Sequence, residues 1–394
     1  MLELLRPNHA YPLYIHVPFC RKKCSYCAFY SIRQNATNQD QYQQVLMQEV
    51  SDVVSVLAHP FDTVYIGGGD PGLLDVAYLI ELLDVITTHG KPVECTIEIN
   101  PTSLTDEHER LIEAGVNRFS IGIQSMHETT LRTLGRQAAV SDNHRAFALI
   151  NSWKRAHAIE CNGDLMTCIP GQQISDAIQD IDTLVDMLHP DHISLYNLTI
   201  EEGTELSRQI ADQTLPLSSE DQQYDILNAC WEHLHARGYE HYEISNFSQN
   251  RTHRSRHNEH YWRLDDYIGL GPAAAGTLTT DDGNVIRTAC TPSVTSYQRV
   301  WKAYHYETLT TSEVMLELIL VGLRTADGID LASWKSRFSQ DFTKICHHTI
   351  ERCMQQSPPL MMCDAHRCAL TEVGFMMLDS IVALCAEELE ASAP

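Results

Sequence analysis

Short apolar runs alternate with amphipathic helical patterns through residues 1–238, and this alternation limits the possible folds more than any other feature of the chain. The apolar runs have the length of strands and lie at residues 13–17, 63–66, 94–98, 117–122, 159–165 and 192–197. The helical patterns lie at residues 41–57, 74–88, 106–114, 142–157, 174–188 and 219–237. Strands that are connected through helices pair in parallel. We therefore predict an α/β protein in which these units form an open parallel (β/α)6 barrel.

The pattern changes after residue 238, which indicates more than one structural unit in a chain of 394 residues. Residues 239–305 are rich in His, Tyr and Gly and are expected to form a connecting region. Residues 306–394 read as several helices with a hairpin at residues 360–371. The predicted domains are thus a barrel over residues 1–238, the connecting region, and a smaller, mainly helical C-terminal domain.

Polar or glycine-rich segments follow each predicted strand of the barrel. They are the cysteine-rich loop after residue 17, Gly67-Gly68-Gly69-Asp70, Glu98-Ile99-Asn100, Gln124-Ser125, Asp164 and Tyr196-Asn197. One such segment alone is usually an ordinary turn or loop. The C-terminal ends of parallel barrel strands lie on one face, however, and active sites are built there. Together these segments predict a ligand site on that face.

Cys20, Cys24 and Cys27 stand close together in a loop directly after the first strand. Soft thiolate ligands in a flexible loop, with Arg21 and its two lysine neighbours to offset their charge, are what an iron–sulfur site needs. A zinc site would usually have a fourth ligand at similar local spacing, which this loop lacks. Three protein ligands on a four-iron cluster would leave one iron open to bind another molecule.

The other ten of the thirteen cysteines are scattered along the chain. They are Cys95, Cys161, Cys168, Cys230, Cys290, Cys346, Cys353, Cys363, Cys368 and Cys385. We expect most of them to be reduced and to pack as small core residues. Cys363 and Cys368 enclose His366 and could suggest a metal site, but a turn between two short strands is the preferred interpretation.

The chain is strongly acidic, with 28 Lys and Arg against 52 Asp and Glu and a formal charge of -24. This balance argues against nucleic acid as a partner. A winged-helix, DNA-docking alternative for residues 306–394 is opposed by six basic against thirteen acidic residues there, so a lid or partner-docking role is preferred. We expect a cytoplasmic protein because the sequence has neither a secretory signal nor an apolar run long enough to cross a membrane.

The cysteine triad and the glycine turn after the second strand resemble the radical S-adenosylmethionine (SAM) superfamily. Further segments resemble the relatives of oxygen-independent coproporphyrinogen III oxidase, and among them the haem-chaperone, or HemW-type, branch. The matching segments lie at residues 14–20, 65–71, 97–101, 118–125, 134–136, 164, 170–172, 242–247, 257–262 and 267–272. They occur in order and span residues 14 to 272.

The resemblance implies that Cys20, Cys24 and Cys27 hold a [4Fe-4S] cluster and that SAM chelates the fourth iron. It places nine residues around SAM or an adjacent ligand, namely Tyr14, Tyr26, Gly68, Gly69, Asp70, Glu98, Gln124, Arg136 and Asp164. The chemistry implied is one-electron reduction of the sulfonium, giving methionine and a 5′-deoxyadenosyl radical. No catalytic side chain is assigned.

Two features favour the haem-chaperone branch over the oxidases. The oxidases that the chain resembles carry a further cysteine where Phe29 stands, and they have a longer segment before the cluster than the nineteen residues before Cys20. In the haem-chaperone branch the pattern His-Asn-x-x-Tyr-Trp serves for haem, which implies a haem site at His257, Tyr261 and Trp262. The imidazole could ligate iron while the two aromatic rings pack against the porphyrin. The alternative is that His257 caps a helix or belongs to a polar network in a His-rich segment.

The resemblance thus implies a haem-binding radical SAM protein that carries haem as cargo to haem-dependent, often respiratory, enzymes. A membrane-bound recipient would bring the protein to the membrane surface, and a homodimer is possible. The alternative function is that of an oxygen-independent coproporphyrinogen III oxidase in porphyrin biosynthesis.

Two positions depart from the haem-chaperone pattern. Asp70 replaces the Thr or Ser that usually follows the three glycines, and it could place a carboxylate near the carboxylate of SAM. Like charges at that point would weaken SAM binding unless Asp70 points away or meets the sulfonium. Gln137 stands where a His is common.

Overall fold

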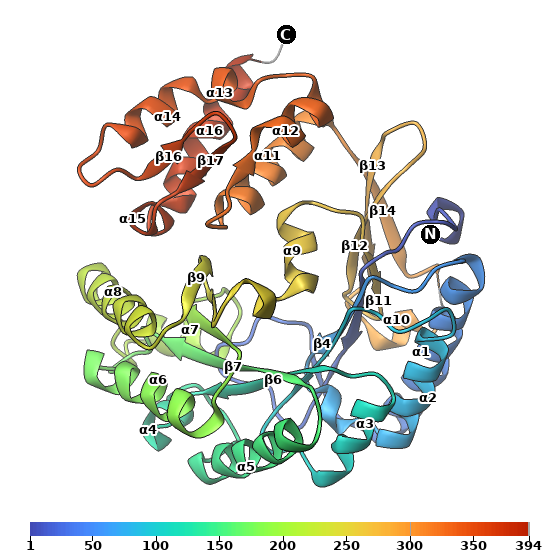
Figure 1. Cartoon of the computed structure of the whole chain (residues 1–394). Helices are drawn as coiled ribbons and strands as arrows, with labels where there is room; N and C mark the ends of the chain where they lie inside the picture. Colours follow the sequence, from blue (N-terminus) through green and yellow to red (C-terminus); the bar gives the residue numbers. More distant parts are fainter. Residues whose placement is uncertain (300, 393–394) are drawn as a thin grey trace.

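A nine-stranded sheet forms the centre of the molecule in the computed structural model, which describes residues 1–299 and 301–392 (Figure 1). The strand order is β11-β1-β4-β5-β6-β7-β8-β10-β9. The strands from β11 to β8 pair in parallel, and β10 and β9 continue the sheet in antiparallel pairing. The six predicted strands are β1 (Leu13–Val17), β4 (Thr63–Gly68), β5 (Glu94–Ile99), β6 (Arg118–Gln124), β7 (Glu160–Thr167) and β8 (His192–Asn197). The predicted open α/β barrel is confirmed.

Helices cover the outside of the sheet as an arc (Figure 1). The predicted ones are α1 (Ala36–Val56), α2 (Val76–Ile86), η3 (Asp106–Glu109) with α3 (Arg110–Glu113), α5 (Val140–Ala156), α6 (Ile174–Leu188) and α8 (Glu220–Ala236). The short helices η1 (Leu2–Leu4), η2 (Pro71–Leu73), α4 (Glu128–Thr133) and α7 (Glu205–Ala211) were not predicted, because so few residues carry no clear periodicity. Side-chain caps fix several helix starts; Asn35, Asp75 and Ser219 accept bonds from backbone amides of the first turn.

Residues 239–305, expected to connect two domains, contribute three strands to the main sheet. These are β9 (Glu240–Glu243), β10 (Asn246–Ser248) and β11 (Ile268–Leu270). A second sheet contains β12 (Ala275–Thr279), β13 (Val285–Cys290) and β14 (Tyr304–Leu309), and η4 (Arg251–His253), α9 (Arg256–Trp262) and α10 (Val294–Tyr297) complete the region. These strands escape sequence reasoning because most of them are short and lack a clear apolar alternation, and β11 pairs with a strand far away in the chain.

The C-terminal unit begins after β14, whose residues span the predicted boundary at 305–306. Its helices are α11 (Thr311–Leu323), α12 (Leu331–Phe338), α13 (Phe342–Ile345), α14 (His347–Met354), α15 (Glu372–Phe375) and α16 (Leu378–Ser392). They surround a small sheet of β15 (Ile329–Asp330), β17 (Arg367–Leu370) and β16 (Met361–Cys363). The predicted hairpin at 360–371 is therefore present as β16 and β17.

Two of the ten scattered cysteines are not free thiols, which corrects the expectation for this pair. Cys363 and Cys368 form a disulfide across the hairpin. The antiparallel register places these two residues directly opposite each other, a relation that sequence spacing alone does not reveal. The other eight scattered cysteines are free and buried, as expected for core thiols.

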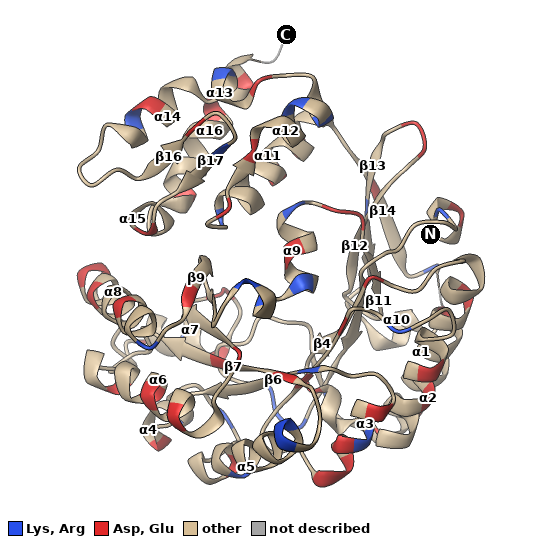
Figure 2. Ribbon diagram, in the orientation of Figure 1, with Lys and Arg blue, Asp and Glu red and all other residues tan. Residues whose placement is uncertain are grey.

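Acidic side chains lie on the outer helices, for example on α3, α6 and α8, with Lys and Arg scattered among them (Figure 2). Among the described residues, no helix combines the length and the apolar character needed to cross a membrane.

One carboxyl group is fully enclosed where α1, α10 and the end of β11 meet. Glu49 is 0% exposed, and its Oε2 accepts bonds from the Tyr297 hydroxyl and from the Gly271 amide, which lies 3.2 Å away. Its Oε1 has no hydrogen-bond partner. Burial raises the pKa of Glu49 to about 7. The unpartnered Oε1 is the oxygen that can carry the proton.

We predict that Glu49→Gln changes the pH dependence of stability. The folded protein keeps the Glu49 proton up to about pH 7, whereas the unfolded chain releases it near its ordinary pKa of 4.5. Wild-type stability should therefore fall, relative to the variant, as pH rises between these values, by on the order of 2–3 kcal/mol. Urea unfolding of both cluster-free proteins at about pH 5 and about pH 8 measures this difference. The exposed Glu113→Gln is the control, and an unchanged wild-type-to-variant difference between the two pH values contradicts the assignment.

Candidate functional site

A cavity of about 400 Å³ opens at the C-terminal ends of the barrel strands and contains most of the predicted site. Its lining includes the three clustered cysteines and eight of the nine residues predicted around SAM. These residues are Cys20, Cys24, Cys27, Tyr26, Gly68, Gly69, Asp70, Glu98, Gln124, Arg136 and Asp164. Segments that are far apart in the sequence converge here because the parallel register brings the strand ends to one edge.

The cysteine loop is closed at its base by a short parallel pair of strands. β2 (Phe19–Cys20) pairs with β3 (Ile32–Arg33), and the Gln34 amide donates to the Cys20 carbonyl over 2.9 Å. All three thiols are free and half-buried. Burial raises the pKa of Cys20 to about 11 and also raises that of Cys27, so a bound metal cluster would displace thiol protons.

These thiols fit an iron–sulfur cluster by the chemistry of the donor set. They are soft ligands, they line one cavity, and among the residues that the structure describes no fourth thiol lines it with them. The Arg136 guanidinium lies 3.7 Å from Cys24 Sγ and supplies a buried positive charge beside the thiols. Arg21, Lys22 and Lys23 line the same cavity from the exposed side of the loop.

Close contacts with neighbouring residues require glycine at positions 68 and 69. Gly68 has φ +112°, and a Cβ there would lie 2.7 Å from the ring of His16. A Cβ on Gly69 would lie 2.5 Å from the carbonyl oxygen of Phe19, at the base of the cysteine loop. The glycine turn can therefore pack directly against the strand that carries the first cysteine.

The acidic residues of the cavity are held by hydrogen bonds from residues of the sheet. Glu98 accepts from the Tyr65 hydroxyl at 2.6 Å and from the Gly68 amide at 3.0 Å. Asp164 accepts from Asn162 Nδ2 at 2.7 Å. Burial raises the pKa of Glu98 to about 7 and also raises the pKa of Asp164.

Hydrogen bonds from neighbouring residues hold the carboxylate of Asp70 in place. The Ser103 hydroxyl lies 2.8 Å from both carboxylate oxygens and shares its one proton between them, and the Asn100 amide donates over 3.2 Å; Asp70 is only 3% exposed. Burial raises the pKa of Asp70. The charge that the sequence suggested would oppose SAM is therefore partly compensated by local donors.

Gln124 reaches the cavity through an unusual backbone conformation. It has φ +66°, and the pairing between β6 and β7 shifts register between Ile121 and Gln124. A bulge at a strand end redirects the side chain that follows it, and such strained positions are common at functional sites.

Tyr14, also predicted around SAM, does not line this cavity. Its hydroxyl lies 2.9 Å from Nδ1 of His16, and the other ring nitrogen of His16 lies 2.9 Å from the carbonyl oxygen of Tyr30. Tyr14 therefore orients the imidazole that packs under Gly68.

Sequence reasoning did not assign a role to two further residues of the cavity wall. The side-chain oxygen of Asn100 accepts from Arg136 Nη2 at 2.7 Å and so fixes the guanidinium beside Cys24. Tyr196 lines the cavity and is 42% exposed. Both lie at or directly after a strand end and belong to the polar strand-end segments of the sequence, which by themselves give neither residue a role of its own.

The residues predicted for haem lie at the other end of the barrel. His257 is 0% exposed, and its Nδ1 is 2.8 Å from the hydroxyl of Thr63, the first residue of β4. Its Nε2 is 2.7 Å from the hydroxyl of Tyr261, and its ring stacks on Tyr65 with 5.2 Å between centroids. Trp262 is half-buried and packs edge-on against Tyr242.

Ligation of haem iron by His257 stays a prediction. Both nitrogens of His257 are hydrogen-bonded, as in the polar-network alternative. Burial lowers the pKa of His257 to about 3, so the ring is neutral.

The parallel barrel with three free cysteines at its C-terminal face defines a radical SAM protein, and comparisons agree. The Radical SAM superfamily profile matches residues 14–184, and that of the HemN C-terminal domain matches residues 309–376. The chain is 30% identical to the zebrafish (Danio rerio) "Radical S-adenosyl methionine domain-containing protein 1, mitochondrial", over 98% of this chain and 89% of that protein. It is 34% identical to the "Heme chaperone HemW" of Escherichia coli K12, over 71% of this chain and 73% of that protein. The chain belongs to the HemW-type family of radical SAM proteins.

The fold also matches a solved structure. Coproporphyrinogen III oxidase (HemN) from Escherichia coli superposes with a TM-score of 0.79 at 21% identity, over 97% of this chain and 91% of that chain. This similarity in fold covers the C-terminal unit as well as the barrel.

We predict that Cys24→Ala abolishes a four-iron cluster, whereas Cys353→Ala leaves it intact. Cys24 lines the cavity beside Arg136, while Cys353 is a buried core thiol of the C-terminal unit. Anaerobic reconstitution followed by iron and sulfide analysis and absorption spectroscopy measures the cluster. Equal loss in both variants, or a full cluster in Cys24→Ala, would move the site away from this loop.

Proposed function

We propose that this protein is a haem chaperone that binds haem in the cytoplasm and delivers it to haem-dependent proteins. A [4Fe-4S] cluster and SAM are the cofactors of the proposal, held in the cavity at the C-terminal face of the barrel. Support comes from the relatives named "Heme chaperone HemW", among them the Escherichia coli protein at 34% identity and the Bacillus subtilis protein at 31%.

The observation that carries the proposal is the phenylalanine at position 29. Phe29 is 70% exposed and lies in the lining of the cluster cavity. The oxidases that the chain resembles carry a cysteine at this position. A phenylalanine at this position cannot supply the thiol that the oxidases carry there, which favours the haem-chaperone branch.

The side chains of the cavity have defined tasks in this proposal. Cys20, Cys24 and Cys27 would hold the cluster, and bound SAM would receive one electron from it. Arg136 would offset the negative charge of the cluster from the buried side of the cavity. Glu98 and Asp164, with their raised pKa values, would accept hydrogen bonds from the polar groups of SAM.

His257, Tyr261 and Trp262 are the proposed haem contacts. Iron ligation through Nε2 of His257 requires the imidazole to give up its bond to the Tyr261 hydroxyl. Exchange of that bond for a bond to iron would couple haem uptake to a local rearrangement of α9.

The recipients proposed are respiratory enzymes, including membrane-bound ones, and the protein would reach the membrane through them. A homodimer is also part of the proposal.

We predict that the anaerobically reconstituted protein binds one equivalent of haem and that Tyr261→Phe binds it more tightly. The substitution keeps the aromatic ring but removes the hydroxyl that occupies His257 Nε2. Freeing one such hydrogen bond, worth about 1 kcal/mol, should increase the affinity roughly fivefold. Titration followed by the Soret band measures both proteins.

His257→Ala should weaken haem binding while the cluster is retained, and added imidazole should restore the ligation spectrum. His260→Ala, on the same helix, is the matched control. An unchanged haem spectrum in His257→Ala excludes that residue as the ligand. If the reduced wild-type protein with SAM converts coproporphyrinogen to protoporphyrinogen in sustained turnover, the oxidase function replaces the chaperone function.

A further inference from the structure

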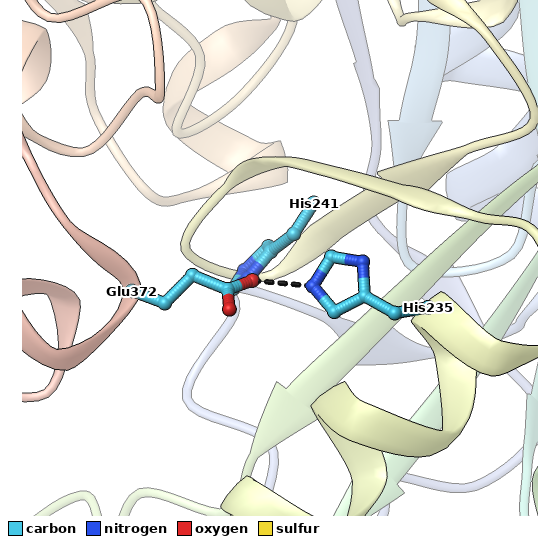
Figure 3. Close-up of side chains that lie close together, drawn as sticks. All are labelled: His235, His241 and Glu372. Atoms are coloured by element: carbon cyan, nitrogen blue, oxygen red, sulfur yellow. Dashed lines mark hydrogen bonds and ion pairs between the residues drawn. The ribbon is translucent and has the colours of Figure 1, made fainter.

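Three potential metal ligands meet between the barrel and the C-terminal unit, far from the cysteine cavity in the sequence. They are His235 on α8, His241 on β9 and Glu372 at the start of α15 (Figure 3). One ligand atom from each lies within 4.8 Å of the other two. Glu372 Oε1 is 2.5 Å from His235 Nε2 and 3.0 Å from His241 Nδ1.

His241 has the surroundings of a metal-binding histidine. Its side chain is 1% exposed, and its ring stacks on Phe247 with 4.1 Å between centroids. Its Nε2 lies 3.3 Å from the carbonyl oxygen of Ile244, which can only accept a hydrogen bond. When Nε2 carries the proton, Nδ1 of the neutral ring presents a lone pair toward Glu372. A ring nitrogen fixed on a backbone carbonyl is the usual support of a histidine that binds metal through its other nitrogen.

The opposite side of the cluster is accessible to an ion. The side chains of His235 and Glu372 are 41% and 47% exposed, so both can adjust their positions. A small increase in the distances between the three ligand atoms would make room for an ion with bonds of about 2.0–2.2 Å. Two imidazoles and one carboxylate favour borderline divalent ions such as Zn²⁺, and they leave a position open to water.

We propose that His235, His241 and Glu372 form a binding site for a divalent transition metal ion of the Zn²⁺ class. This site is separate from the cysteine loop and does not depend on the haem-chaperone function. Its position gives the ion a structural task, because two ligands belong to the barrel and the third to the C-terminal unit.

The backbone next to His241 already joins the two units. The Ile244 amide donates to the Arg324 carbonyl over 3.0 Å, and the Ala326 amide donates to the Tyr242 carbonyl over 2.9 Å. An ion shared by His241 and Glu372 would add a second link and fix α15 against β9. Metal binding should therefore reduce hydrogen exchange of the amides at 240–244 and 372–375.

The test uses untagged protein carrying its assembled cluster, titrated anaerobically with Co²⁺ as a spectroscopic probe. We expect one equivalent of Co²⁺ to give visible ligand-field bands without the thiolate-to-cobalt band that binding to cysteines would produce. Excess Zn²⁺ should displace it. His235→Ala and Glu372→Gln change partly exposed side chains and should each weaken Co²⁺ binding by at least about tenfold.

His233→Ala is the matched control, since His233 lies on the same helix and pairs with Asp182 instead. It should bind Co²⁺ as the wild type does. Unchanged affinity in both His235→Ala and Glu372→Gln overturns the proposal. Absence of Co²⁺ binding, or binding that shows a thiolate band, overturns it as well and leaves the three side chains as ion pairs only.

Discussion

The parallel register of β1 and β4 through β8 is the constraint on which the rest of the structure depends. It brings the cysteine loop, the glycine turn and the polar ends of the later strands to one edge, although residues 20 and 164 are far apart in the sequence. Tight packing under the glycines then fixes the cysteine loop on this edge. Without this register, Arg136 could not reach both Cys24 and Asn100, and the thiols would lack their buried counter-charge.

A connected series of polar and aromatic side chains runs through the barrel interior. Its members are joined by hydrogen bonds and by ring stacking. Thr63, His257 and Tyr261 form a hydrogen-bonded set at the N-terminal end of β4, and Tyr65 stacks on His257. The Tyr65 hydroxyl donates to Glu98, which lines the cavity at the other end. Burying a polar group without a hydrogen-bond partner costs free energy. A change at His257 should therefore alter the positions of Tyr65 and Glu98. These contacts would connect the proposed haem contacts to the proposed SAM site.

The local sequence pattern was sufficient to predict the six parallel strands and to single out the three clustered cysteines. The six strands were found because each is a short apolar run, and the cysteine triad was found because its spacing has no core-packing explanation. What was missed depends on contacts between distant residues. β11 is recognised only by its pairing with β1, the Cys363–Cys368 disulfide only by hairpin register, and the bonded state of His257 only by the position of Thr63. The grouping of His235, His241 and Glu372 requires the docking of two units and has no sequence signature.

In the proposed function, one cavity holds both the cluster and SAM. The electron paramagnetic resonance spectrum of the reduced, reconstituted protein, recorded with and without SAM, tests it most directly. SAM bound to the open iron should change the g-values of the reduced cluster, and SAM labelled with ¹⁷O in the carboxylate or ¹⁵N in the amino group should show hyperfine coupling to the cluster. A spectrum that is identical with and without saturating SAM, and that shows no coupling to either label, would contradict the account.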